Sequence, residues 1–234
     1  MPVTDYLVRN AELYPDEVAL VELNPDEKDT RRTTWKEFDL IQPINNMPYR
    51  REITWSVFNE KANRFANMLL SRGVKKGDKV AILMYNCLEW LPIYFGVLKT
   101  GAIAVPFNFR YDSDEIYYCA ELAQVDVIVF GFAFIGRIEV NAERLSRGRL
   151  LIYVGDNCPS FAESYHELVA DCSSKEPDVK ITEDDYGAIY FSSGTTGFPK
   201  AILHKHQSLT QAAIMEQKHH STGRDDTFLC IPPL

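Results

Sequence analysis

From Lys79 to Val154 the sequence alternates between short apolar runs and longer amphipathic segments, and this alternation most constrains the fold. Short runs rich in Val, Ile and Leu are typical of buried strands, and apolar residues at helical spacing fill the gaps. Strands joined through helices run parallel, with helices on both faces of the sheet. The expected strands are residues 80–84, 103–105, 127–130 and 150–154, and the expected helices are 88–99, 115–123 and 132–146. The sequence predicts an α/β fold with a mainly parallel sheet flanked by helices.

Before this alternation, the sequence predicts one long helix that Thr54 caps and Gly73 ends. Phe58, Phe65 and Leu69 fall on one face of it at helical spacing. An amphipathic start and a short strand at 18–21 are expected upstream, whereas residues 171–185 are charged and irregular. Further along, a helix is expected at 207–218 and a strand at 226–231.

Composition excludes several classes of protein. The formal charge is −8 and no basic cluster is long, which argues against nucleic acid or an anionic membrane as the main partner. No apolar run reaches the roughly 20 residues of a membrane span, so a soluble chain is expected. The five cysteines form no C-x-x-C pair, and the first residues do not read as a signal peptide. Free thiols in the cytoplasm are the expectation, and no metal site is assigned.

Residues 192–200, with the sequence SSGTTGFPK, have the makeup of a loop that holds phosphate. Glycines let backbone N–H groups approach an anion, hydroxyls donate hydrogen bonds, and Lys200 supplies a compact positive charge. The preceding residues 186–191 are apolar and aromatic, so a buried strand is expected to deliver the loop. Residues 201–204 after the loop are also expected to be extended.

Two other interpretations of this loop fit less well. A Walker-type loop needs glycines five apart, a lysine, then Ser or Thr. Here Gly194 and Gly197 are closer together, Pro199 precedes Lys200, and Ala201 stands where magnesium would need a hydroxyl. A flexible linker should have polar flanks, but this loop lies between two apolar segments.

Residues 189–200 are similar to the signature loop of the AMP-binding, adenylate-forming superfamily, which includes acyl-CoA synthetases, luciferases and the adenylation domains of peptide synthetases. Residues 86–90, 96–102 and 105–108 are similar to upstream segments of that family, and 204–209 resemble the start of its next helix. Agreement over the whole loop is far more specific than a bare glycine pattern. The resemblance spans residues 54–234 and points to the N-terminal part of an acyl-CoA synthetase.

The resemblance implies that a carboxylate attacks the α-phosphorus of ATP, that pyrophosphate leaves, and that a thiol then captures the acyl-AMP. Lys200 is the candidate catalytic residue, because its charge would offset the charge that grows on pyrophosphate. The implied cofactors and substrates are ATP, Mg²⁺, CoA and a small carboxylic acid, and assembly into a homo-oligomer stays open. The residues expected to bind the nucleotide are Ser192, Ser193, Gly194, Thr195, Thr196, Gly197, Lys200 and His206.

The resemblance also divides the chain. Residues 1–53 form an N-terminal segment, 54–170 a βα subdomain, and 186–234 the start of a second subdomain that carries the loop. Residues 50–58 repeat the pattern of 31–38, whereas the family has one such unit, so 33–49 resembles an insertion. A surface loop or β-ribbon and a contact to a partner subunit are both open for it.

Other polar residues are weaker candidates. His206 stands where the family usually has a histidine, and packing beneath the loop and ligand contact are both open. His204 and the pair His219-His220 are expected to be surface histidines. For Asp184-Asp185 a solvated start of the strand is expected. Trp35, Trp55 and Trp90 are expected to be core or interface anchors.

By resemblance, the acyl pocket, the glutamate that holds magnesium and the small C-terminal domain lie beyond the equivalent of Leu234. The chain is therefore expected to be inactive by itself. Two alternatives stay open, namely an adenylation domain of a peptide synthetase and a truncated nucleotide-binding or scaffold protein without catalysis. The acyl chain length is not assigned from the sequence.

Overall fold

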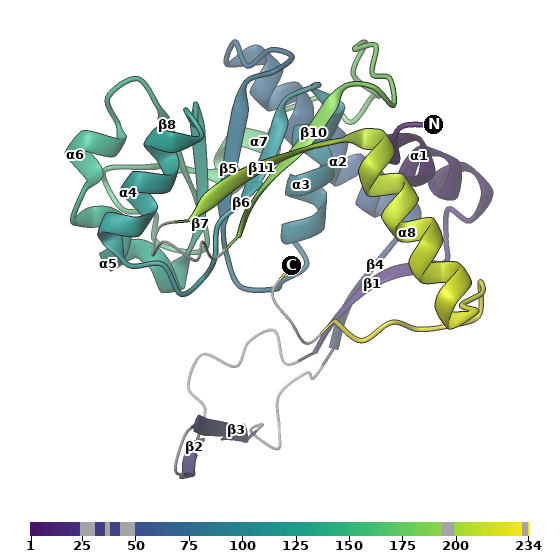
Figure 1. Cartoon of the computed structure of the whole chain (residues 1–234), viewed down its shortest axis with the longest axis horizontal. Helices are drawn as coiled ribbons and strands as arrows, with labels where there is room; N and C mark the ends of the chain where they lie inside the picture. The colour runs from purple at the N-terminus through teal and green to yellow at the C-terminus, as the bar shows by residue number, and fades with distance from the viewer. Residues whose placement is uncertain (24–30, 36–37, 43–49, 193–198, 231–233) are drawn as a thin grey trace.

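The computed structural model describes residues 1–23, 31–35, 38–42, 50–192, 199–230 and 234 (Figure 1). The helices are α1 (Val3–Leu13), α2 (Trp55–Ser71), α3 (Trp90–Lys99), α4 (Ser113–Leu122), α5 (Ile135–Glu139), α6 (Ala142–Leu145), α7 (Tyr165–Ala170) and α8 (His206–His220), with a 3₁₀ turn η1 (Phe132–Phe134). The strands are β1 (Val18–Leu23), β2 (Arg31–Trp35), β3 (Phe38–Gln42), β4 (Arg50–Thr54), β5 (Lys79–Leu83), β6 (Ile103–Pro106), β7 (Val127–Gly131), β8 (Leu150–Val154), β9 (Glu163–Ser164), β10 (Tyr186–Ser192) and β11 (Lys200–Lys205).

A seven-stranded sheet forms the centre of the fold, in the order β11-β10-β6-β5-β7-β8-β9 (Figure 1). All neighbouring strands in it are parallel except the antiparallel pair β10 and β11. The four strands expected from the apolar runs are β5 to β8, and they lie side by side in the middle. The predicted α/β fold with a mainly parallel sheet is confirmed.

The sheet is buried on both faces because successive side chains of a strand point to opposite sides. Val80 and Ile82 of β5 pack among residues of α2 and α3. Ala81 and Leu83 of the same strand pack among residues of α4, α5 and α6. Each of these four side chains is at most 1% exposed, which explains why the strand reads as a continuous apolar run.

Helices α2 and α3 pack closely on one face of the sheet. The cap and the end predicted for α2 are both present, since Thr54 Oγ1 accepts a hydrogen bond from Val57 N at 3.4 Å and Gly73 follows the helix with φ +85°. Gly96 of α3 permits the close approach, because a Cβ there would lie 2.8 Å from the carbonyl oxygen of Ala62. Neither α2 nor any other helix among the described residues is long and apolar enough to cross a membrane.

The helix expected over residues 132–146 is instead three short pieces, η1, α5 and α6. Asn141 separates the last two with φ −114° and ψ 15°, outside the helical region. Its Nδ2 donates to the carbonyl oxygen of Ser113 at 2.9 Å, so a tertiary hydrogen bond replaces the continuation of the helix. The helical spacing of apolar residues in the sequence does not reveal such a bond.

The strand expected at residues 226–231 is also wrong over its described part. Residues 226–230 have no regular structure, and Phe228 and Leu229 are 86% and 67% exposed. A strand needs a neighbouring edge for its backbone groups. None of the described strands pairs with this stretch.

The N-terminal segment lies outside the central sheet. Strand β1 pairs with β4, and β2 pairs with β3, both antiparallel. The second pair overlaps the segment 33–49 interpreted as an insertion, although β2 begins two residues earlier, and its pairing agrees with the β-ribbon alternative. Residues 36–37 and 43–49 of that segment lie outside the described residues, and its assignment as an insertion stays a prediction.

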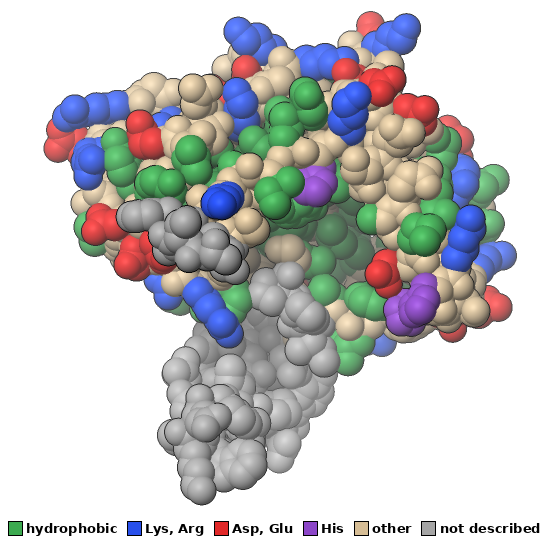
Figure 2. Space-filling view, viewed as in Figure 1, with side chains coloured by type: hydrophobic (Ala, Val, Ile, Leu, Met, Phe, Trp, Pro, Cys, Tyr) green, Lys and Arg blue, Asp and Glu red, His purple; other side chains and the backbone are tan. Residues whose placement is uncertain are grey.

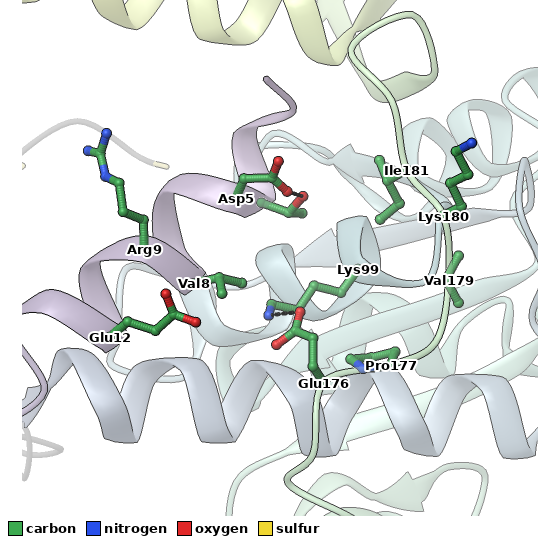
Figure 3. A pocket seen from close by; sticks show the side chains of 11 residues that line it. Asp5, Val8, Arg9, Glu12, Lys99, Glu176, Pro177, Val179, Lys180 and Ile181 are labelled. Carbon is green, nitrogen blue, oxygen red and sulfur yellow. Dashed lines mark hydrogen bonds and ion pairs between the residues drawn. The ribbon is translucent and has the colours of Figure 1, made fainter.

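The charged stretch 171–185 crosses the amino end of the sheet without regular structure and is fastened to α2 and α3. Lys99 at the end of α3 is 2% exposed, and its Nζ donates to Asn59 Oδ1 at 2.8 Å and to Glu176 Oε1 at 2.5 Å. Burial lowers the pKa of Lys99, and the carboxylates of Glu176 and Asp5 oppose that shift. Figure 3 shows this ion pair in a pocket of about 420 Å³ between α1 and the stretch.

Replacing Gly96 by Ala is expected to destabilise the chain by about 1–3 kcal/mol, because the added methyl group would force α2 and α3 apart. Gly136→Ala is the matched control, since that helical glycine is exposed and a Cβ there meets nothing within 4 Å. The control should be neutral or gain up to about 1 kcal/mol. Urea unfolding of both variants measures the difference, and equal stabilities would contradict the packing.

Candidate functional site

The β10–β11 hairpin carries the sequence that resembles a phosphate loop. Ser192 and Lys200 form the last described pair of its antiparallel ladder, so residues 193–199 connect the two strands. Ser192 is half-buried and Lys200 is exposed. The strands expected before and after the loop are both present. The other loop residues predicted to bind the nucleotide, Ser193, Gly194, Thr195, Thr196 and Gly197, lie outside the described residues.

The hairpin presents this connection at the carboxyl edge of the parallel strands, because β10 runs parallel to β6. In open α/β sheets this edge is where ligands bind. The aromatic ring of Phe191, next to Ser192, packs edge-on against Phe107, which follows β6, at a centroid distance of 5.8 Å. It also meets the ring of Tyr111 at 6.4 Å. These contacts attach the loop end of the hairpin to the edge of the sheet.

The base of the hairpin is held by two neighbouring aspartates in different settings. The carboxylate of Asp185 accepts hydrogen bonds from Lys76 Nζ at 2.6 Å and from Thr182 N at 2.8 Å. Burial raises the pKa of Asp185, but the hydrogen bonds from Lys76 and Thr182 outweigh it, so the pKa lies below its usual value. Asp184 is 78% exposed and pairs with Lys205 at 3.1 Å. The solvated position expected for both aspartates is found for Asp184, whereas the carboxylate of Asp185 is bonded to Lys76 and Thr182.

His206 begins α8 directly after β11 and is fully buried. Its backbone N donates to the carbonyl oxygen of Asp185 at 2.9 Å. Neither ring nitrogen has a hydrogen-bond partner among the described residues. Burial lowers its pKa, Asp185 and Asp5 oppose that shift, and Lys76 adds to it. The sequence left open packing beneath the loop and ligand contact, and the structure places the buried ring at the opposite end of the hairpin, beside Gly187.

The remaining histidines differ from one another. His219 and His220 are exposed as expected, and His220 Nε2 lies 3.2 Å from Glu216 Oε2. His204 is instead half-buried, with its ring edge-on to Tyr190 at a centroid distance of 5.4 Å. The hydroxyl of Tyr190 lies 3.0 Å from that of Tyr94 on α3. This contact joins residues 96 positions apart and was not predicted from the sequence.

Figure 2 shows a hollow with apolar side chains between the hairpin and α8. Tyr190 and Ile202 of the hairpin are 37% and 46% exposed, and Met215 of α8 is 64% exposed.

Of the tryptophans, Trp90 is 4% exposed and stacks on Tyr94, and Trp55 stacks on Phe58, so both are anchors as expected. The side chain of Trp35 lies outside the described residues.

The pocket beside Lys99 lies far from this loop in the topology. Helix α3 runs back from the carboxyl edge to the amino edge of the sheet, so its last residue marks the opposite edge. The pocket holds charges of both signs over apolar residues such as Val8 and Ile181 (Figure 3). We therefore place the candidate site at the hairpin.

Comparison with known proteins gives a family match. The model of the family described as AMP-binding enzyme matches residues 7–234. The chain is 33% identical over 162 residues to long-chain-fatty-acid–CoA ligase FadD13 of Mycobacterium tuberculosis, covering 69% of the chain and 31% of that protein. It is 29% identical over 189 residues to crotonobetaine/carnitine–CoA ligase of Salmonella paratyphi C, covering 78% and 36%. The chain thus spans about a third of the length of these curated relatives.

Solved structures show the same fold. The fatty acyl CoA synthetase of Mycobacterium tuberculosis matches with a TM-score of 0.71 and 25% identity, covering 93% of this chain and 37% of that one. The anthranilate CoA ligase AuaEII, solved in complex with anthranoyl-AMP, matches with a TM-score of 0.76 and 24% identity, covering 92% and 36%. The fold of this chain therefore recurs in part of each of these structures.

Lys76→Met is expected to cost about 1 kcal/mol, because the half-buried Asp185 loses a charged hydrogen bond. Lys205→Met, which breaks the exposed pair with Asp184, should cost at most about 0.5 kcal/mol. Because the pKa of Asp185 is lowered in the folded state, its contribution is present above its ordinary value of 3.8 and is lost as the pH falls. Urea unfolding at neutral pH and below about pH 4 measures both effects. An equal loss of unfolding free energy in the two variants would contradict the structural role of the Lys76–Asp185 ion pair.

Proposed function

The chain belongs to the AMP-binding enzyme family, and on this premise we propose that it takes part in ATP-dependent activation of a carboxylic acid. A carboxylate oxygen attacks the α-phosphorus of ATP, the bond from that phosphorus to the bridging oxygen breaks, and pyrophosphate leaves with the electron pair. The acyl-AMP then reacts with the thiol of CoA, which gives a thioester, AMP and a proton. The named relatives are CoA ligases, which supports CoA as the acceptor.

The observation that carries this proposal is the placement of the loop. The last described pair of the hairpin, Ser192 and Lys200, lies at the edge of the sheet where ligands bind in open α/β folds. In the proposed role, Lys200 offsets the negative charge that grows on pyrophosphate as the bond breaks. The hydroxyls of Ser193, Thr195 and Thr196 donate hydrogen bonds to phosphate oxygens. Each such donor is expected to lower the barrier by about 2–4 kcal/mol in a complete enzyme.

The described residues fit the parts of this chemistry unequally. Lys200 is an exposed cation beside the loop, which suits a polyphosphate. Among the residues whose structure is described, no cluster of His, Cys, Asp or Glu is suited to hold a metal ion. We therefore derive no step through magnesium. A fatty or aryl acid is the substrate class that residues 86–90 and 107–110 favour by resemblance.

Lys200→Ala is expected to weaken binding of ATP by at least about tenfold, because the loop loses its one compact positive charge. Titration calorimetry with the 234-residue chain measures the affinity directly. Lys218→Ala is the matched control, because this lysine is exposed on α8, away from the hairpin. An affinity that is the same for Lys200→Ala and the unchanged chain would refute the role of this lysine.

We also propose that these 234 residues do not catalyse formation of the acyl-AMP by themselves. Catalysis requires the carboxylate and the α-phosphate to be held together, and the site proposed above assigns Lys200 and the loop hydroxyls to the phosphates but assigns no residue to the carboxylate. Carboxylate-dependent exchange of pyrophosphate into ATP should therefore stay at background, even when ATP binds. Substantial exchange by the purified chain would contradict this expectation.

A further inference from the structure

His206 lies at the joint between the hairpin and α8, where it can influence the loop without touching a nucleotide. Strand β10 is joined to the rest of the sheet through a single described ladder pair, Ala188 with Ala104. Beyond Ala188 its described ladder partner is β11 alone. The direction of the hairpin therefore depends on the contacts at its base, on the buried side chain of Ile189, and on the contacts of Tyr190 and Phe191.

The imidazole of His206 fills the space between the base of β10 and the first turn of α8. A Cβ added at Gly187 would lie 3.3 Å from His206 Nε2 and 3.2 Å from Leu209 Cδ1, so strand and helix already touch there. The backbone of the same region is fixed, because His206 N donates to Asp185 O and Gln207 N donates to Glu183 O, both at 2.9 Å. The ring thus sets the spacing between β10 and α8.

We propose that His206 is a positioning residue, whose buried ring holds the base of the β10–β11 hairpin and thereby sets the position of its other end, at Ser192 and Lys200. The consequence for nucleotide binding rests on the function proposed above. The effect on the hairpin does not. This role explains a fully buried histidine whose ring nitrogens bond to none of the described residues.

The length of the hairpin magnifies a small change in the contact between His206 and the base of β10. Strand β11 has six residues, which is roughly 20 Å at about 3.3 Å per residue. A tilt of about 3° at the base then moves the loop by about 1 Å. A displacement of that size is enough to reduce the function of a polar site about 100-fold.

The charge state of the ring matters because the site is closed to water. The charged groups that face it are Asp5 from α1, Asp185 before β10 and Lys76 before β5. Burial, the largest cause, lowers the pKa of His206 below its ordinary 6.5, so the folded chain keeps the ring neutral. A lowered pKa means that the ring contributes its stability above about pH 6.5 and loses it as the pH falls. Acid should therefore loosen the base of the hairpin.

The test compares the unchanged chain with His206→Ala and His206→Phe, where Phe keeps a ring that cannot take a proton. One readout is hydrogen exchange of peptides that cover residues 186–205, and the other is the affinity for Mg·ATP. We expect His206→Ala to speed exchange in the hairpin and to weaken binding about tenfold, while His206→Phe restores both. His219→Ala, an exposed histidine of the same helix, is the control.

The pH profile separates positioning from general stability. Between about pH 8 and about pH 5.5 the unchanged chain should lose affinity relative to His206→Phe, and the protonation of ATP cancels because both proteins see the same nucleotide. Parallel profiles would overturn the role of the neutral ring. Unchanged exchange and affinity in His206→Ala would overturn the inference as a whole.

The two proposals fail in different ways. If the unchanged chain did not bind Mg·ATP, the proposed function would fail, and the exchange data would still decide whether His206 holds the hairpin. If it bound ATP and His206→Ala changed neither readout, the proposed function would stand and the positioning role would be wrong.

Discussion

The hydrogen bonds that converge on Asp185 are the constraint on which the candidate site depends. Its carbonyl oxygen accepts from the first residue of α8, and its carboxylate accepts from Lys76 before β5. One residue thus ties the start of β10 both to the central sheet and to the helix that follows the hairpin. Because β10 has one described ladder pair with β6, these bonds add to the attachment that Ile189, Tyr190 and Phe191 provide further along the strand.

The two edges of the sheet have different tasks. At the amino edge, Lys99 and Glu176 fasten the stretch 171–185 to the end of α3, and Asn63 and Asn67 bond it to the middle of α2. At the carboxyl edge, Phe107 and Tyr111 receive the aromatic side chain that precedes the loop. The core between the edges is buried on both faces and close-packed, so the two edges belong to one rigid body. A rigid body of this kind suits a loop that has to meet a polyphosphate in a fixed geometry.

Sequence patterns were sufficient where a local cause decides the structure. The apolar runs of β5 to β8 and the cap at Thr54 depend on neighbouring residues, and they were predicted from them. Patterns failed where a distant residue decides, as at Asn141, whose bond to Ser113 ends the expected helix. For the candidate site, the composition of the loop indicated phosphate binding. The ion pair of Lys76 with Asp185 joins residues 109 positions apart, and no pattern in the sequence indicated it.

The central claim is that the β10–β11 hairpin at the carboxyl edge of the sheet binds the triphosphate of ATP. Titration of Mg·ATP into the isotope-labelled chain, followed by the shifts of its backbone amide signals, tests this claim most directly. The account predicts that the shifted signals belong to residues 192–200 and to the neighbouring segment 107–111. Shifts confined to the pocket around Thr4, Lys99 and Lys180 at the opposite edge, or no shifts at all, would contradict it.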